Sequence, residues 1–316
     1  MAAQAGRSDM NKTLCFLVII GALSLESRAA TLQRANACRQ TTDNALRSCR
    51  NAAPSDFWLA RGKCANVTQR EEQTACEQDA STAQREALVT CNAQRDARQA
   101  VCRRLGGAPY EPEIEPTDFV AGVDNLYFPL PPGTTFIYEG HTPDGLERDT
   151  FSVTHDSRVI AGVRCVEVRD TVTRDGELIE DTLDWFAQDR EGNVWYFGEN
   201  AKQLAGGLIV GVEGSWTAGV DGARPGIAMR ARPGVGDFYR QEFTLGTAED
   251  IGSVVSLTEA VTVPYGSFDA CVETEDTTPL SPESVEHKFY APGIGAVLEL
   301  DPETGERLEL VRITTD

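Results

Sequence analysis

Hydrophobic and polar residues alternate in short runs along the last two thirds of the chain, from Pro132 onward. In Val285–Tyr290, for example, every second residue starting at Val285 falls on one side of an extended backbone, whereas Glu286 and Lys288 fall on the other. Asp-Gly and Gly-Asn turn signals separate many of these runs. The pattern therefore predicts strands joined by hairpins, as in an antiparallel barrel, half-barrel or sandwich.

The predicted strands number about a dozen, and most have a length typical of a strand in a folded sheet. They are Thr134–Gly140, Asp149–His155, Arg158–Thr173, Leu178–Gln188, Asn193–Glu199, Gly207–Glu213, Gly226–Arg230, Asp237–Leu245, Val254–Val263, Phe268–Glu275, Val285–Ala291, Ala296–Asp301 and Arg307–Ile313. We expect them to form an antiparallel half-barrel or open β-barrel. The whole chain is then of the α+β class and mainly β.

The preceding part of the chain is rich in Ala, Arg, Gln and Glu, which favour helices. We expect one helix over Ala30–Asn51, ending before Pro54. A longer helix is expected to start at the capping-box pattern Thr68–Glu71, with Thr68 as N-cap, and to continue to Leu105. Large aliphatic residues are sparse here, so an ordinary apolar core cannot hold these two helices together.

Cysteines offer another means of joining the helices. Six of them follow one another at separations of 11, 15, 12, 15 and 11 residues, a series that is the same in both directions. Antiparallel helices with equal cysteine separations can be bridged at two levels. We therefore predict three disulfides in a helical hairpin, although six cysteines allow 15 pairings in principle. The predicted pairs are Cys38–Cys102, Cys49–Cys91 and Cys64–Cys76.

The charge of the chain changes at the end of the cysteine-rich part, near residue 107. The formal net charge of −20 combines 12 Lys and Arg against 8 Asp and Glu in residues 30–107, 14 against 39 in residues 108–316, and 3 against 2 in residues 1–29. The acidic part argues against nucleic-acid binding, because a phosphate backbone would repel it. We expect a cysteine-rich hairpin over 30–107, a proline-rich linker over 108–131 and a β domain over 132–316. Most carboxylates are expected on the solvated side of the sheet.

The first residues have the pattern of an export signal. Lys12 precedes the apolar run Leu14–Leu23, and Ser27–Ala29 offers small residues at a cleavage site. This predicts a signal peptide over residues 1–29 and a secreted or periplasmic protein, which also suits disulfides. An uncleaved N-terminal anchor and a start at Met10 are the alternatives. No later stretch of the sequence is apolar enough to cross a membrane.

Several motifs of the chain resemble a group of exported bacterial proteins of unknown function, over about two thirds of the length from Pro109 onward. These motifs are Tyr127–Glu139, Asp184–Asp189 with Gly192–Glu199, Val263–Phe268 and Glu286–Gly295. The Phe-Pro-Leu start and the Tyr-Ala-Pro-Gly-Ile-Gly end are also similar to envelope half-barrel families that include periplasmic lipoprotein carriers. The resemblance implies a curved sheet whose concave face binds an apolar or lipid-like ligand, and it brings no active site with it.

Catalytic and metal-binding patterns are weak. No Gly-x-Ser-x-Gly motif occurs, and the pairs His155-Asp156 and Glu286-His287 are isolated, so no catalytic residue is assigned. A chance pair of acids could satisfy the spacing of a glycoside hydrolase. Calcium is the one ion considered, at the turns Asp189–Asn193 and Asp301–Glu306, where an ordinary Asx turn is the alternative. No cofactor is otherwise expected.

Aromatic residues concentrate in the middle and late strands, where they form the core or line a groove of an incompletely closed sheet. The candidate ligand-binding residues are Trp185, Trp195, Trp216, Tyr239, Phe243 and Phe289. Cys165 and Cys271 fall in strands and are either bonded to each other or buried thiols.

The sequence leaves three functions open. The first is a non-enzymatic exported protein that binds a lipid-like ligand or an envelope partner through the concave face of the β domain. The second is a hydrolase of an envelope polymer that uses carboxylates in the groove. The third is a structural interaction module that docks through the helical hairpin. A deep cavity favours the first, converging carboxylates favour the second, and a filled interior favours the third.

Overall fold

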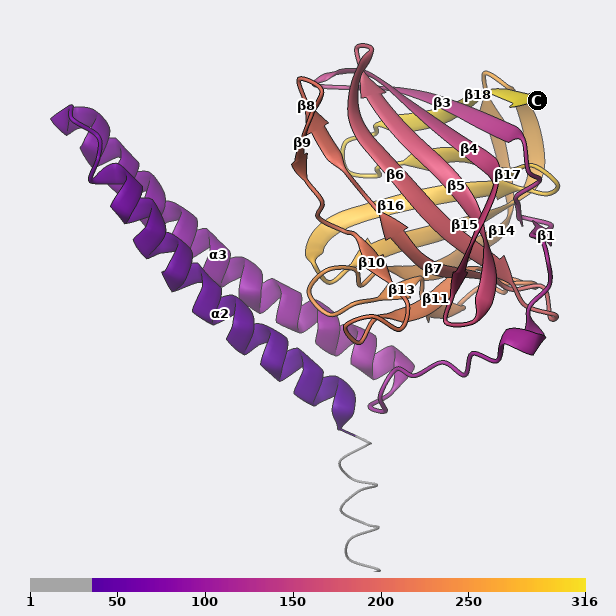
Figure 1. Ribbon diagram of the computed structural model, residues 1–316, viewed down its shortest axis with the longest axis horizontal. Helices are drawn as coiled ribbons and strands as arrows, with labels where there is room; N and C mark the ends of the chain where they lie inside the picture. Colours follow the sequence, from indigo (N-terminus) through magenta and orange to yellow (C-terminus); the bar gives the residue numbers. More distant parts are fainter. Residues whose placement is uncertain (1–35) are drawn as a thin grey trace, which may run out of the picture.

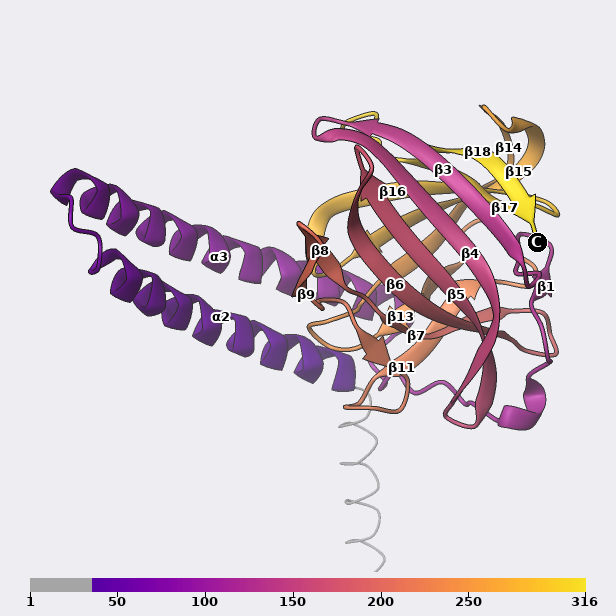
Figure 2. The same ribbon diagram turned by 45° about the horizontal axis from the view of Figure 1, so that its top comes forward.

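The computed structural model of the chain describes residues 36–316, so the predicted signal peptide and the start of the first predicted helix lie outside the described residues. Two antiparallel helices, α2 (Ala37–Cys64) and α3 (Arg70–Leu105), form a long hairpin. Figures 1 and 2 show this hairpin projecting from one side of a β structure, with the turn between the helices farthest from it. The predicted α+β, mainly β fold is confirmed.

Three disulfides join the two helices: Cys38–Cys102, Cys49–Cys91 and Cys64–Cys76, with Cα–Cα distances of 5.8, 5.7 and 5.6 Å. They are the pairs that the symmetric spacing predicts. Few hairpin side chains are buried, and those that are include small residues such as Ala53 and Ala80. The disulfides therefore supply cohesion that the sparse apolar contacts cannot.

Two details of the predicted helices are wrong. The first helix does not end before Pro54 but continues through it to Cys64. Proline costs one helical hydrogen bond, and the disulfides of Cys49 and Cys64 hold the helix against α3 on both sides of it. The second helix has Gln69, not Thr68, as its N-cap, and no side-chain cap is formed. Its first hydrogen bond runs from Gln73 N–H to the Gln69 carbonyl.

The β part is one antiparallel sheet of 16 strands plus a two-stranded ribbon. Its hydrogen-bonded path runs in the order β12-β14-β15-β16-β17-β18-β3-β4-β5-β6-β7-β11-β13, with β8, β9 and β10 beside it. The strands are β1 (Asp124–Asn125), β2 (Phe128–Pro129), β3 (Thr134–Thr142), β4 (Gly145–Ile160), β5 (Val163–Arg174), β6 (Glu177–Gln188), β7 (Val194–Asn200), β8 (Gln203–Ala205), β9 (Leu208–Gly211), β10 (Trp216–Thr217), β11 (Arg224–Met229), β12 (Phe238–Arg240), β13 (Glu242–Phe243), β14 (Ile251–Val263), β15 (Gly266–Thr278), β16 (Ser281–Ala291), β17 (Gly295–Leu300) and β18 (Arg307–Thr315).

The sheet curves strongly but is not closed by a continuous ladder of hydrogen bonds. Its two ends, β12 and β13, follow one another in the chain with only Gln241 between them. Figure 2 shows the curved strands surrounding a common interior. The result is an open barrel, in agreement with the predicted architecture.

Two predicted strands are divided. Asp237–Leu245 is divided at Gln241 into β12 and β13, which lie at the two ends of the sheet path. Arg158–Thr173 is divided by a turn. β4 ends at Ile160 and β5 begins at Val163, because Ala161 and Gly162 both have positive φ values, 49° and 82°. Such a two-residue turn suits the twist of a hairpin. The sequence did not indicate this turn because alanine is an unusual residue at the first central position of such a turn.

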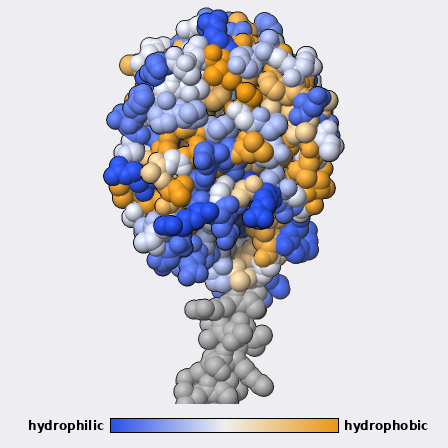
Figure 3. Space-filling model, turned by 90° about the vertical axis from the view of Figure 1, so that its right-hand side faces the viewer, coloured by the Kyte–Doolittle hydropathy of each residue, from blue (hydrophilic) through white to orange (hydrophobic). Residues whose placement is uncertain are grey.

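Apolar side chains form two clusters on the described residues. The larger one includes Val153, Val168 and Leu310, and the second one, around Trp185 and Phe197, lies against the chain before β1 and the loops around β10. The end of the molecule seen in Figure 3 mixes small hydrophobic groups with charged ones. The two clusters form the core of the β part, whereas Leu208, Ile209 and Val210 remain exposed.

The segment expected to be a linker packs on the barrel. Val123 and Leu130 are buried in the larger cluster, and Leu130 N–H donates to the Val123 carbonyl. Asn125 Nδ2 donates to the carbonyls of Gly192 and Arg230, which ties this segment to two loops of the sheet. The chain before β3 thus covers one end of the barrel.

The hairpin docks on the barrel through α3. Arg98 makes a two-pronged ion pair with Glu249, whose side chains are 7% and 1% exposed, at 2.7 Å. Nearby, the guanidinium of Arg104 lies 3.7 Å from the ring centre of Phe238, and Gln94 Nε2 donates to the Leu280 carbonyl. A basic helix face therefore meets the acidic β domain.

Candidate functional site

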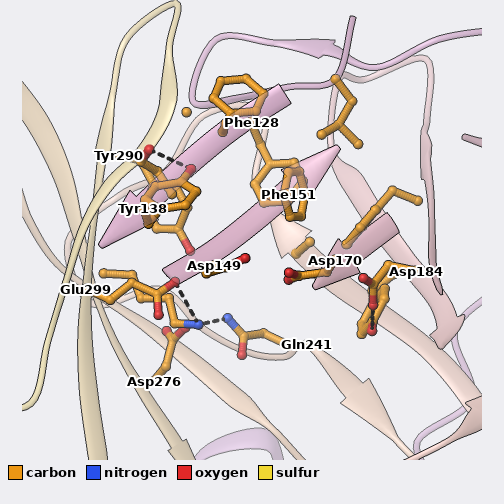
Figure 4. Close-up of a pocket in the computed structure, with 18 of the residues that line it drawn as sticks. Phe128, Tyr138, Asp149, Phe151, Asp170, Asp184, Gln241, Asp276, Tyr290 and Glu299 are labelled. Carbon is orange, nitrogen blue, oxygen red and sulfur yellow. Dashed lines mark hydrogen bonds and ion pairs between the residues drawn. The ribbon is translucent and has the colours of Figure 1, made fainter. Parts of the chain in front are cut away.

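The interior of the open barrel contains a cavity of about 310 Å³. Aromatic and aliphatic side chains form one part of its wall, among them Phe128, Phe136, Phe151, Phe186 and Ile294. Figure 4 shows Phe128 and Phe151 on one side of the cavity. A volume near 300 Å³ lies at the lower end of the range for small-molecule sites.

Carboxyl groups form the other part of the wall, and they come from successive strands. They are Asp149 on β4, Asp170 on β5, Asp184 on β6, Glu199 on β7, Glu242 on β13, Asp250 before β14, Asp276 on β15 and Glu299 on β17. Seven of them lie on strands, where side chains alternate between the two faces, and Asp250 directly precedes β14. The strand register places some of them directly opposite one another, as for Asp184 and Glu199.

Asp149 and Asp170 interact with each other across adjacent strands, at the centre of Figure 4. Burial raises the pKa of both carboxyl groups, and the charge of Asp170 raises the pKa of Asp149 further. With both groups ionised, Asp149 Oδ1 and Asp170 Oδ1 have no hydrogen-bond donor. Protonation of Asp149 supplies a donor to Asp170, so the pair can hold one proton between its members.

The next inward carboxyl groups are linked through a tyrosine. Tyr196 donates its hydroxyl hydrogen to Asp184 Oδ1 at 2.5 Å. Burial nevertheless holds the pKa of Asp184 well above its ordinary value. Burial also raises the pKa of Glu199 to about 7, helped by the charges of Glu180 and Asp250. This side of the pocket can therefore change its charge near neutral pH.

Lys288 on β16 is the one basic side chain in the cavity wall. Its ammonium lies 3.5 Å from Glu286 Oε2 and 3.5 Å from Glu299 Oε1. The charge of Glu299 is the main reason that the pKa of Lys288 is raised well above its ordinary value. Opposite it, Gln241 Nε2 donates to Asp276 Oδ2, whereas Asp276 Oδ1 has no donor. The lysine thus offsets only a small part of the acidic wall.

The expectation that the carboxylates lie mostly on the solvated side of the sheet is wrong for these eight residues. Alternation identifies which residues share a face, but it does not say which face is inside. On β6, for instance, Asp184 and Phe186 line the cavity, whereas Asp181 lies outside it and pairs with exposed Arg169. An interior cavity allows polar side chains to face inward without being packed against apolar ones.

None of the six predicted ligand-binding aromatic residues lines this cavity. The residues that do are often their sequence neighbours: Tyr196 lines it rather than Trp195, and Tyr290 rather than Phe289. A shift of one residue moves a side chain to the other face of a strand. Aromatic residues of these strands therefore do line the cavity, but they are not the six that were named.

The structure places the six residues as follows. Trp185 and Trp216 belong to the second apolar cluster and share a cavity of about 390 Å³ with Arg158, whose guanidinium lies 4.1 Å from the Trp185 ring centre. Trp195 packs against the same cluster and donates its Nε1–H to Asp189. Tyr239 and Phe289 are buried in the larger cluster, and Phe243 contacts Tyr110 and Arg240.

Both turns considered for calcium use their carboxylates internally. Asp189 accepts hydrogen bonds from the backbone N–H and the side chain of Asn193, and Asp301 accepts them from the N–H groups of Glu303 and Thr304. In residues 36–316, no group of three or more His, Cys, Asp or Glu is arranged to hold a metal ion.

The remaining candidates have structural partners. Cys165 and Cys271 are both buried free thiols, so the disulfide left open between them does not form. His287 Nδ1 lies 2.6 Å from Glu273 Oε1, and exposed His155 lies 3.6 Å from Asp316.

The fold and the site define an open antiparallel β-barrel with an acidic and aromatic internal pocket, to which a disulfide-linked helical hairpin is attached. Among solved structures, the chain is similar to a protein from Parabacteroides distasonis ATCC 8503 that is provisionally described as a lipoprotein, with 14% sequence identity and a TM-score of 0.34. The alignment covers 60% of this chain and 99% of that one. No protein-family model and no curated protein matches the chain.

Within residues 36–316, no helix is both long and apolar enough to cross a membrane. The likeness to the lipoprotein is too distant to indicate a function. The internal pocket is therefore the feature of the molecule from which a function can be inferred.

Proposed function

We propose that the protein is an exported, non-enzymatic binding protein whose barrel holds a small amphiphilic ligand. The observation that carries this proposal is the cavity of about 310 Å³, whose wall is divided into an aromatic part and a carboxyl part. Such a division suits a ligand with an apolar body and one polar group. A purely structural module would have no need of an unfilled interior.

The disulfides support an exported location. Cysteine pairs such as Cys38–Cys102 persist in oxidising compartments and are rare in the cytosol. Together with the signal-peptide pattern of residues 1–29, they favour a secreted or periplasmic protein.

Native mass spectrometry of the full chain, purified from its source, tests the proposal. We expect the wild-type protein to retain a discrete lipid-like mass. Ala228→Phe, which fills part of the cavity wall, should lose that mass. Val159→Phe is the matched control, because Val159 is 61% exposed on β4. Wild-type protein that is empty in native spectra, and whose melting temperature no lipid of a panel raises, would contradict the proposal.

A second candidate, a hydrolase of an envelope polymer, is favoured by one observation. Asp149 and Asp170 are coupled carboxyl groups in a pocket, an arrangement in which one acid can donate a proton while the other is ionised. This candidate predicts that the wild-type protein releases reducing ends from cell-wall glycans. Asp149→Asn and Asp170→Asn should abolish that activity, whereas Asp181→Asn, outside the pocket, should retain it. Absence of turnover by the wild-type protein would reject it.

A further inference from the structure

The charge of the cavity wall is far from balanced. Eight carboxyl groups face the cavity and only Lys288 opposes them. Lys288 is shared between Glu286 and Glu299, and its charge also partly offsets the burial that raises the pKa of Asp149, Asp170 and Asp276, so one positive charge is divided among many carboxyl groups. Burying several like charges together is costly unless they are protonated or meet a cation.

Buried oxygens without a hydrogen-bond partner also indicate that the cavity binds a group that donates hydrogen bonds. Asp149 Oδ1, Asp170 Oδ1 and Asp276 Oδ1 are buried oxygens that accept no hydrogen bond when the three carboxyl groups are ionised. Asp149 and Asp170 belong to the adjacent strands β4 and β5, whereas Asp276 belongs to β15, which β16, β17, β18 and β3 separate from them in the sheet. Buried acceptors without a donor are rare in folded proteins, and a group rich in N–H donors would satisfy several of them at once.

The aromatic part of the wall suits a cation as well as an apolar chain. The rings of Tyr138, Tyr196 and Tyr290 line the cavity beside the carboxyl groups. The faces of aromatic rings attract organic cations, most strongly where water is excluded. Phe128 and Phe151 then leave an apolar surface for the rest of the molecule (Figure 4).

We propose that the ligand of this pocket is an organic ammonium compound with an apolar tail, its ammonium group held by the carboxyl groups of Asp149, Asp170 and Asp276. This inference depends on the proposed function and adds the chemical class of the ligand. A bare metal ion fits less well, since no set of three metal-binding side chains occurs within residues 36–316. The cavity is also far larger than one ion.

Binding of an ammonium compound should release protons, whereas binding of a neutral apolar molecule should not. Burial raises the pKa of most of these carboxyl groups, so part of them hold protons when the pocket is empty. A cation favours their ionised form, and its binding must therefore release protons to the buffer. A neutral molecule with the same tail would release none.

Calorimetric titration of the full chain with three probes tests this inference: octylammonium chloride, octyl β-glucoside and sodium octyl sulfate, each below its micellar concentration. At pH 7 we expect octylammonium to bind at least about tenfold more tightly than the glucoside. Its binding should release protons, seen as a dependence of the heat on the ionisation enthalpy of the buffer. Its affinity should rise with pH while that of the glucoside stays constant.

Variants of the cavity wall test which carboxyl groups bind octylammonium. Asp149→Asn combined with Asp170→Asn should weaken octylammonium binding about tenfold or more and leave glucoside binding unchanged, whereas the outer control Asp181→Asn should change neither. Equal affinity for octylammonium and the glucoside, or tighter binding of the sulfate, would overturn the ammonium assignment while leaving the proposed function intact. Failure of all three probes to bind would count against both. The pH series on the wild-type protein keeps the test decisive if the double variant does not fold.

Discussion

The carboxyl group of Glu199 couples the charge of the pocket to the stability of the fold. Its ordinary pKa is 4.5, and burial raises it to about 7 in the folded protein. Between these values the folded protein binds a proton that the unfolded chain has lost. Glu199 therefore contributes stability that is complete below pH 4.5 and is lost as the pH rises through about 7.

Glu199→Gln should consequently stabilise the unliganded protein at pH 8, by on the order of 1–3 kcal/mol, and have little effect at pH 4.5. Urea denaturation of the two proteins across this pH range measures the difference. Asp181→Asn provides a control of opposite sign, because the hydrogen bond from Arg169 lowers the pKa of Asp181. Its stabilising contribution is present above the ordinary pKa and is lost in acid. A constant difference between Glu199→Gln and wild type at every pH would contradict the account.

Residue-level placement was the least predictable part of the molecule. Of the neighbours Trp195 and Tyr196 only Tyr196 lines the cavity, and nothing in the sequence indicates which face of β7 is turned toward it. Bulges in the sheet, such as the shift between Trp185 and Phe186 in the pairing of β6 with β7, also change the face along a strand. The one sequence signal for the buried acids is that many strands have an acidic residue among aromatic residues.

At the scale of elements, the hairpin depends on its disulfides more than on its apolar contacts. The Cys49–Cys91 bond closes a loop with a sequence separation of 42, and Cys64–Cys76 closes one of 12. Cross-linking a longer loop removes more entropy from the unfolded chain. The symmetric spacing made this element the most predictable one, because two straight helices leave little freedom for other pairings.

Replacing both cysteines of a pair by alanine should therefore destabilise the hairpin by about 4 kcal/mol for Cys49 and Cys91 and by about 3 kcal/mol for Cys64 and Cys76. Helical circular dichroism should be lost at a lower temperature in the first variant than in the second. The β signal of the barrel should melt as in the wild type. Helical melting that is the same in both variants and the wild type would show that the bonds do not hold the hairpin.

The contact between hairpin and barrel depends on one buried ion pair. Arg98→Ala leaves Glu249 buried without its cation and should cost about 3–5 kcal/mol of docking stability. The double variant Arg98→Met with Glu249→Gln removes both charges and should cost less. Hydrogen exchange of the amides around Arg98 in α3 measures the docking. Equal protection in wild type and Arg98→Ala would show that the pair does not fix the hairpin.

At the scale of the whole molecule, the order of two helices followed by many antiparallel strands follows from local patterns, although several strand boundaries do not. The open barrel was predicted because runs of strands linked by tight turns have few other arrangements. A groove on the concave face was expected, but its acidic wall was not, because the wall residues come from strands such as β4 and β15 that are far apart in sequence and meet only when the sheet curves. Of the 39 acidic residues in residues 108–316, eight line the interior of the barrel.

Photoaffinity labelling tests most directly whether the interior of the barrel is the binding site. The probes are octylammonium and octyl β-glucoside that carry a diazirine near the end of the alkyl tail, irradiated with the full chain and mapped by peptide mass spectrometry. The account predicts labels on the apolar wall, at Phe128, Phe151 and Phe186, that disappear in Ala228→Phe. Labels confined to exposed apolar residues such as Leu208–Val212 or Trp58, and unchanged in that variant, would contradict it.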